Sequence, residues 1–145
     1  MQIYDLLKTD HDKVKDLLTS IEKKQDSELF QQLKKEMIIH NEAKEEEVFY
    51  RRLHEKAGNL KIIVITGNSE HELVIKMLNQ LDKIENKEEW LQLFSVVKKS
   101  IEAHITMEEQ NIFALAKKHF SNQEAEDIGS KMADNKQKLL KKYND

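Results

Sequence analysis

The chain has 145 residues, of which 39% are hydrophobic and 35% charged, and its formal net charge is −3 with histidine neutral. This length predicts a single domain over residues 1–145. The absence of cysteine excludes disulfides, thiolate nucleophiles and thiolate metal sites, and with them zinc fingers and iron–sulfur proteins. The slightly acidic balance disfavours binding to nucleic acid or to an anionic membrane.

Residue usage and hydrophobic spacing predict an all-α protein. The chain has no proline and three glycines, which favours long helices over a turn-rich β fold. Apolar residues at intervals of three and four predict long helices over about residues 3–24, 28–56, 60–85 and 88–119. The pair Ser121 and Glu124 has the spacing of a capping box and begins a short fifth C-terminal helix. Because the connections are short, we expect an up-down antiparallel four-helix bundle.

The third predicted helix contains a segment that also fits other structures. Its residues Ile62–Thr66 are β-branched and could form a strand, and Ser69 could cap a helix that starts later. A lone strand would have no partner elsewhere in the chain, so we expect one helix with Gly67 inside it. Gly58 and Asn59 are typical of the C-terminal end of the preceding helix.

The N-terminal segment lacks the basic region and the long apolar stretch of a signal peptide. No apolar run approaches the roughly 18 residues that a transmembrane helix needs. We therefore expect a cytoplasmic protein.

Each of the four long helices carries one histidine on its apolar face, close to its midpoint. These histidines are His11, His40, His71 and His104. The midpoints of antiparallel neighbours share one level, so the four imidazoles are expected in one layer of the core. Buried imidazoles need partners, and imidazole is the commonest metal ligand, so the layer predicts a metal site. His54 and His119 lie about 21 Å of helix beyond it and are expected at the surface or at helix ends.

Carboxylates join this histidine layer. Glu108 follows His104 by four residues, which places both on one face of a helix. The equivalent position after His40 is Lys44, which cannot bind a metal ion while charged, and Glu45 follows one residue later. A π-bulge between His40 and Glu45 would bring both to the inner face. Glu46 is the alternative ligand if the extra residue lies elsewhere.

Four nitrogens and two carboxylates exceed the needs of one tetrahedral zinc ion. They suit two octahedral ions that share the carboxylates and an oxo or hydroxo bridge. Two coordination positions then stay open for water, dioxygen or another small ligand. Mixed nitrogen and oxygen ligands favour iron, with manganese or a mixed iron–manganese pair as alternatives.

Taken together, the chemistry-bearing segments resemble those of the hemerythrin-like family, the HHE cation-binding proteins, over almost the full chain. The segments that carry the resemblance are Asp10-His11-Asp12, His40 to Tyr50, Glu70-His71-Glu72 and His104 to Phe113. The resemblance implies a non-haem di-iron site in a four-helix bundle. It also implies that His11 and His40 serve one iron, that His71 and His104 serve the other, and that Glu108 and a glutamate after His40 bridge them.

Three features depart from the family pattern. Oxygen-carrying members have a further histidine one turn after the third-helix histidine, where this chain has Ile75, and its loss opens a coordination position. The prolines that commonly follow the aromatic pairs are absent, and Arg51 and Ala114 stand near those places. Glu45 follows His40 by five residues, one more than the spacing of His104 and Glu108.

The sequence therefore predicts a di-iron protein that binds or senses dioxygen, nitric oxide or peroxide, or handles iron, with any protein partner unidentified. An alternative is a helical interaction module whose core histidines are structural or pH-sensitive. A catalytic di-iron oxidase or peroxidase is a third hypothesis, which multiple turnovers with peroxide would demonstrate. No nucleophile–base pair of a hydrolase is recognisable, and the sequence leaves open whether the protein is an enzyme.

Overall fold

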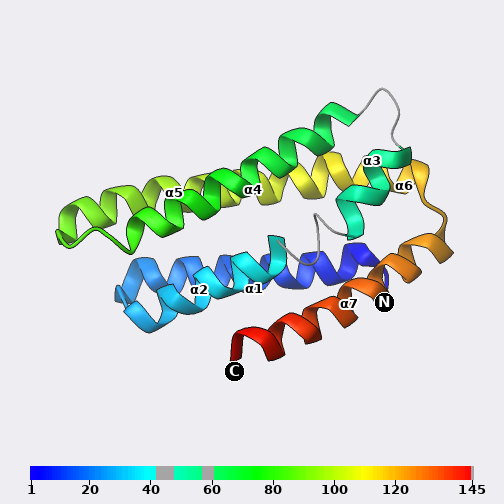
Figure 1. Ribbon diagram of the computed structural model, residues 1–145. Helices are drawn as coiled ribbons and strands as arrows, with labels where there is room; N and C mark the ends of the chain where they lie inside the picture. Colours follow the sequence, from blue (N-terminus) through cyan, green and yellow to red (C-terminus); the bar gives the residue numbers. More distant parts are fainter. Residues whose placement is uncertain (42–47, 57–60, 145) are drawn as a thin grey trace.

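The computed structural model describes residues 1–41, 48–56 and 61–144 (Figure 1). These residues are almost entirely helical, and no β-strand occurs among them, which confirms the predicted all-α class. The helices are α1 (Ile3–Lys24), α2 (Ser27–Ile39), α3 (Arg51–Lys56), α4 (Lys61–Leu81), α5 (Lys87–Met107), the π-helix η3 (Glu108–Ile112), α6 (Phe113–His119) and α7 (Asn122–Asn144). Since α5, η3 and α6 follow one another without a break, they form one rod close to the predicted span 88–119.

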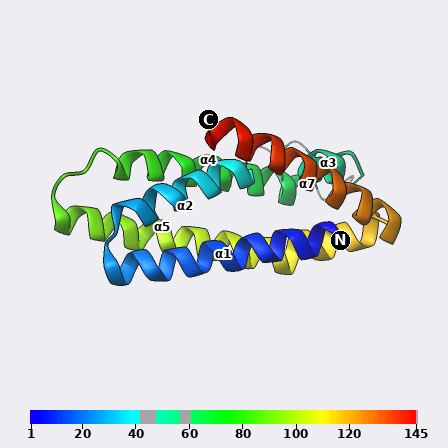
Figure 2. The ribbon, with the colours of Figure 1, turned by 90° about the horizontal axis from the view of Figure 1, so that it is seen from below.

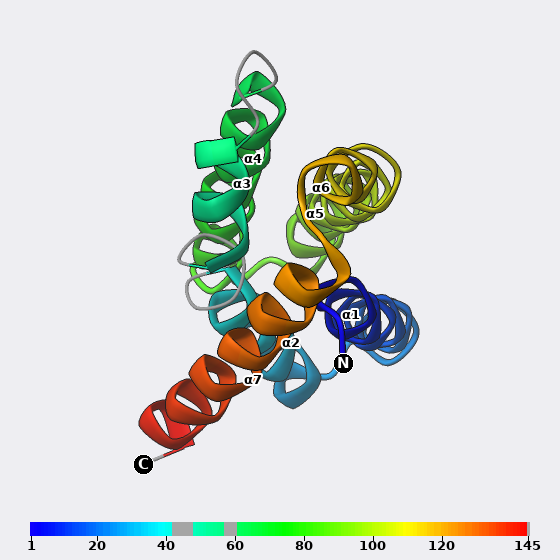
Figure 3. The same ribbon diagram turned by 90° about the vertical axis from the view of Figure 1, so that its right-hand side faces the viewer.

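The long helices α1, α2, α4 and α5 lie side by side, and each runs opposite to the one before it (Figures 1 and 2). Helix α1 packs against α2 and α5, and α4 packs against α5 and α2. Helix α7 crosses over α1 and α2 on one side of this group (Figure 3). None of the described helices is both long enough and apolar enough to cross a bilayer.

Local hydrogen bonds explain where the helices begin. Between α1 and α2, Gln25 adopts the left-handed conformation, with φ 52°, and Asp26 accepts hydrogen bonds from the backbone N–H groups of Glu28 and Leu29. Ser121 and Glu124 form the predicted capping box, in which each backbone N–H donates to the other side chain at 3.1 Å. Such caps satisfy backbone donors that a helix terminus leaves without a partner.

The predicted second helix differs most from the structure. Instead of one α-helix over 28–56, α2 ends at Ile39, residues 40–41 and 48–50 are π-helical, and α3 begins at Arg51. The π-bulge predicted between His40 and Glu45 lies largely outside the described residues, since only residues 40–41 and 48–50 on its two sides are described. The predicted helix end at Gly58 and Asn59 lies outside the described residues.

Two other predicted boundaries are corrected. Helix α4 runs through Gly67 without interruption, which confirms the prediction of a single helix against the alternatives of a strand or a later helix start. The helix ends at Leu81 rather than near residue 85. Helix α7 has 23 residues and is not short. Its buried residues Ile128 and Met132 lie in its first half, and its lysine-rich second half is helical with little burial.

The apolar core consists of two clusters separated by a polar layer. One cluster contains Leu7 of α1 and Ile112 of η3, and the other contains Val14 of α1 and Ile101 of α5. His11 lies between Leu7 and Val14 in the chain, and the other three histidines are buried as well. The predicted polar layer is thus enclosed by apolar side chains.

Candidate metal centre

The four predicted histidines come together in the core from four different segments. His11 lies on α1, His71 on α4 and His104 on α5, while His40 directly follows α2. All four are 5% exposed or less. The ring centroids of His11 and His40 are 5.3 Å apart, and those of His71 and His104 are 4.4 Å apart. The imidazoles therefore form two close pairs.

Glu108 lies between these two pairs and is completely buried. Its Oε1 is 2.9 Å from Nε2 of His11, while its Oε2 is 3.3 Å from Nε2 of His104 and 3.9 Å from Nε2 of His71. Among the described residues, two groups have ligand atoms within 4.8 Å of one another, one of His11, His40 and Glu108, the other of His71, His104 and Glu108. One carboxylate is thus shared by two potential metal sites.

Three of the imidazoles are oriented by carboxylates at their other ring nitrogen. Nδ1 of His40 is 3.4 Å from Asp10, Nδ1 of His104 is 3.0 Å from Glu70, and Nδ1 of His11 is 3.3 Å from Glu109. A carboxylate can only accept a hydrogen bond, so this network assigns the proton to Nδ1 and a lone pair to Nε2. Carboxylate–histidine pairs of this kind orient metal-binding histidines in proteins.

This tautomer assignment makes a cation the natural occupant of the layer. Nε2 of His11 and Oε1 of Glu108 are then two electron-pair donors only 2.9 Å apart, which is unfavourable without a positive charge near them. A proton shared by these two atoms would relieve that one contact, but Nε2 of His71 and of His104 would still face the other oxygen of Glu108. Metal ions satisfy all the nitrogens and the carboxylate at once, so the residues fit a metal pair.

Tyr50 completes the surroundings of Glu108. Its hydroxyl donates to Oε2 of Glu108 at 2.5 Å, and its ring stacks on His71 with the centroids 5.2 Å apart. Tyr50 and Glu108 both belong to π-helical turns, because residues 48–50 and η3 have this conformation. The π turn at Glu108 was not predicted from the sequence, since the four-residue spacing from His104 fits an ordinary α-helix.

The remaining predicted site residues fall into two groups. Glu45 and its alternative Glu46 lie outside the described residues, so the second carboxylate stays a prediction. His54 in α3 and His119 at the end of α6 are half-buried, and neither belongs to a group of potential ligands in the described part of the chain.

Sequence reasoning missed the carboxylates that hold the histidines. Each of them is the direct neighbour of a predicted ligand, since Asp10 precedes His11, Glu70 precedes His71 and Glu109 follows Glu108. In the case of Asp10 and Glu70, the carboxylate contacts the histidine of the next segment rather than its own neighbour. An acid beside a buried histidine was therefore the available signal, although it does not reveal which histidine is contacted.

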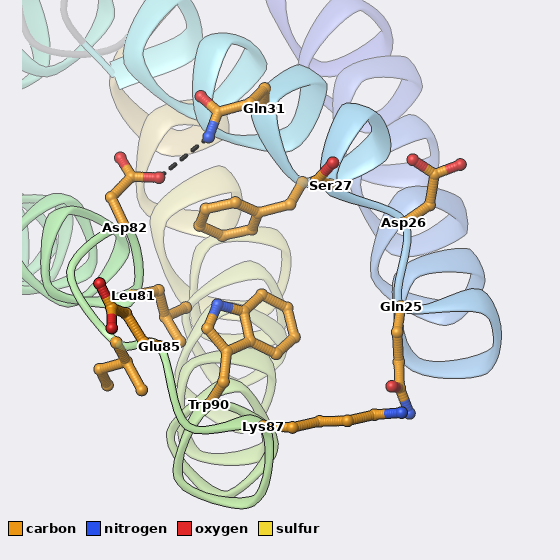
Figure 4. Close-up of a pocket in the computed structure, with 11 residues that line it drawn as sticks. Gln25, Asp26, Ser27, Gln31, Leu81, Asp82, Glu85, Lys87 and Trp90 are labelled. Carbon is orange, nitrogen blue, oxygen red and sulfur yellow. Dashed lines mark hydrogen bonds between the residues drawn. The ribbon is translucent and has the colours of Figure 1, made fainter.

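A cavity of about 10 Å³ adjoins the imidazoles and is lined by the four histidines, by Asn41 and by apolar side chains such as Val14 and Ile101. This is close to the volume that a single water molecule needs. A larger hollow of about 430 Å³ lies at the end of the molecule where α1 connects to α2 and α4 connects to α5 (Figure 4). Its lining includes Trp90, Leu81 and polar residues such as Asp82. It is open to solvent and its lining contains no histidine, so the larger hollow is not the metal centre.

Comparison with known proteins agrees with this geometry. The family model of the hemerythrin HHE cation-binding domain matches residues 2–116. The chain therefore belongs to the hemerythrin HHE cation-binding family, as its motifs indicated. No curated protein and no solved structure matches the chain. The family match and the two histidine–glutamate groups together support a metal-binding role.

Proposed function

We propose that the chain forms one domain, an up-down antiparallel four-helix bundle, and holds a pair of iron ions in its core, with manganese or a mixed pair as alternatives. One ion is bound by the pair His11 and His40 and the other by the pair His71 and His104. Glu108 bridges the two ions, and Glu45 or Glu46 supplies the second carboxylate. Mixed imidazole and carboxylate ligands suit iron and manganese in particular.

The position of Glu108 is the observation that carries this proposal. Its two oxygens face different imidazole pairs, and the side chain is completely buried. A buried carboxylate is stable only beside compensating charge or hydrogen bonds. One hydrogen bond comes from Tyr50, and two metal ions would supply the charge on both sides of the carboxylate.

We infer that the metal pair binds or senses dioxygen, nitric oxide or peroxide, or serves in iron handling. When bound in its reduced state, the pair would supply electrons and open coordination positions to a small ligand. Apolar side chains such as Val14 and Ile101 line the adjoining cavity and limit the access of water to the imidazoles. Ile75, which has no metal-binding atom, stands where oxygen carriers of the family have a histidine, so one position is left for a ligand.

Metal analysis with absorption spectroscopy tests the proposal. Protein purified without added metal should contain about two irons per chain, as the ligand count requires. The absorption spectrum of the reduced protein should change when air is admitted. A chain without iron and without a spectral change would overturn the proposal. That result would favour the alternative of a helical interaction module with structural histidines.

A further inference from the structure

Helix α7 lies outside the part of the chain that the family model matches, which ends at residue 116. It packs across α1 and α2 (Figure 3). Its buried residues Ala125, Ile128 and Met132 belong to the apolar cluster that also contains Ile3 and Leu7 of α1. The helix is thus attached to the face of the molecule that carries His11 and Asp10.

Gly129 fixes how closely α7 approaches α1. A Cβ atom at this position would lie 2.3 Å from the backbone oxygen of Met1 and 3.1 Å from the backbone nitrogen of Ile3. Such distances are shorter than van der Waals contact, so any larger residue would push the two helices apart. The glycine therefore permits the close approach of α7 to the start of α1.

Two turns further on, α7 reaches a carboxylate of the metal centre. Nζ of Lys136 lies 2.9 Å from Oδ1 of Asp10, while the other oxygen of Asp10 lies 3.4 Å from Nδ1 of His40. The Asp10 side chain is 7% exposed and that of Lys136 is 30% exposed. A cavity of about 20 Å³ borders the contact and can hold a water molecule. A continuous chain of contacts thus connects α7 with a predicted ligand.

We propose that Lys136 is a positioning residue of the metal centre, which acts through Asp10 to orient His40 and couples the docking of α7 to metal binding. This inference rests on the proposed function. Without Lys136, the buried Asp10 carboxylate loses an ion pair, which is costly in the interior and leaves the carboxylate poorly fixed. His40 then loses part of its orientation, and outer residues of this kind commonly change metal affinity 10–100-fold.

The effect is confined to one of the two imidazole pairs. His104 is held by Glu70 of α4, and α7 supplies no contact to that carboxylate among those the structure describes. Loss of Lys136 should therefore weaken the ion bound by His11 and His40 and spare the ion bound by His71 and His104. Because coupling is reciprocal, metal binding should in turn hold α7 more firmly in place.

Anaerobic titration with Fe²⁺ against a competing chelator tests the coupling. The wild-type chain should bind two ions. In Lys136→Met one ion should bind as in the wild type and the other about tenfold more weakly. Lys136→Arg, which keeps the charge, should recover most of this loss. Lys138→Met, at an exposed lysine of the same helix, is the matched control and should behave as the wild type.

Hydrogen exchange of the wild-type chain provides a second test that does not depend on the folding of a variant. Amides of α7 should exchange more slowly with Fe²⁺ than without it, by a factor similar to the affinity loss in Lys136→Met. Unchanged exchange, wild-type affinities in Lys136→Met, or an equal loss at both ions would overturn the inference and leave the metal site standing. A wild-type chain that binds no Fe²⁺ would overturn the metal site and the inference together.

Discussion

Glu108 shows why the type of residue matters at the centre of this protein. Its carboxylate meets imidazoles on both sides and accepts a hydrogen bond from Tyr50. A glutamine of the same shape would turn its amide NH₂ group toward one of the two imidazole pairs. That group cannot bind a cation, whereas a carboxylate oxygen can. The completely buried position therefore makes chemical sense for a glutamate that lies between two cations.

The first prediction separates ligands from other histidines. Replacing Glu108 by alanine should remove most of the bound metal, because both ions lose a ligand. His104→Ala should lower metal content less, because it affects one ion directly. Both changes are read as metal per chain by elemental analysis. His54→Ala and His119→Ala are the controls and should leave the metal content at the wild-type level. Equal losses in all four variants would contradict the predicted layer.

Tyr4 buries its hydroxyl group in the interior of the protein. Its hydroxyl makes no hydrogen bond within the described part of the chain, and the residue is 9% exposed. Burial raises the pKa of Tyr4 above its ordinary value of 10.0. The folded state therefore favours the neutral phenol, and stability is lost as the pH rises above about 10, where the unfolded chain ionises first.

Tyr4→Phe should accordingly retain or increase stability, by up to about 1 kcal/mol near neutral pH, because a buried hydroxyl is removed. Above the ordinary tyrosine pKa the advantage of the variant should grow, since phenylalanine cannot ionise. Denaturant unfolding at several pH values measures both effects. A variant that is clearly less stable than the wild type at every pH would show that the hydroxyl makes a favourable contact.

At the scale of helices, Asp82 joins the end of α4 to α2. Its carboxylate accepts a hydrogen bond from Gln31 at 2.9 Å (Figure 4). It also forms an ion pair with Lys34. Burial acts to raise the pKa of Asp82, but the hydrogen bonds from Lys34 and Gln31 outweigh it and lower that pKa below the ordinary 3.8. The contact therefore stabilises the fold above the ordinary pKa and is lost as the pH falls through the folded value.

Asp82→Asn should lower the free energy of unfolding by about 0.5–1 kcal/mol at neutral pH, a small effect because solvent screens this partly exposed pair. The difference between variant and wild type should vanish in acid, once Asp82 is protonated. Urea unfolding at neutral and acidic pH gives the measurement. A difference that persists in acid would assign the effect to packing instead of charge.

The helices also show where sequence patterns are informative and where they are not. The span of α1 follows directly from its apolar spacing, and the capping box at Ser121 marks the start of α7. The π turn of η3 left no such signal, because the four-residue spacing of His104 and Glu108 fits an ordinary α-helix. The contact between Asp10 and His40 was equally hidden, since it depends on how neighbouring helices face each other.

On the scale of the whole molecule, the histidine layer separates two apolar clusters. The four predicted histidines converge in this layer, although His40 directly follows α2 instead of lying near the midpoint of a long helix. Without metal, this layer places four imidazoles and buried carboxylates between apolar residues, which is unfavourable. Metal binding should therefore stabilise the entire fold.

Removal of metal tests this whole-molecule effect. A ligand at 100 times its dissociation constant adds about 2.7 kcal/mol, so the Tm should fall by about 5–10 °C when a chelator strips the protein. Differential scanning calorimetry of stripped and Fe²⁺-loaded protein measures the change. Glu108→Ala should unfold at nearly the same temperature in both conditions. An identical Tm for stripped and loaded wild type would mean that the layer is stable without metal.

Native mass spectrometry of the wild-type chain after anaerobic loading with Fe²⁺ tests the proposed pair of metal ions most directly. Two imidazole pairs around one carboxylate predict that the main species carries two iron ions. A main species with no ion, or with a single ion even at saturating Fe²⁺, would contradict the paired site.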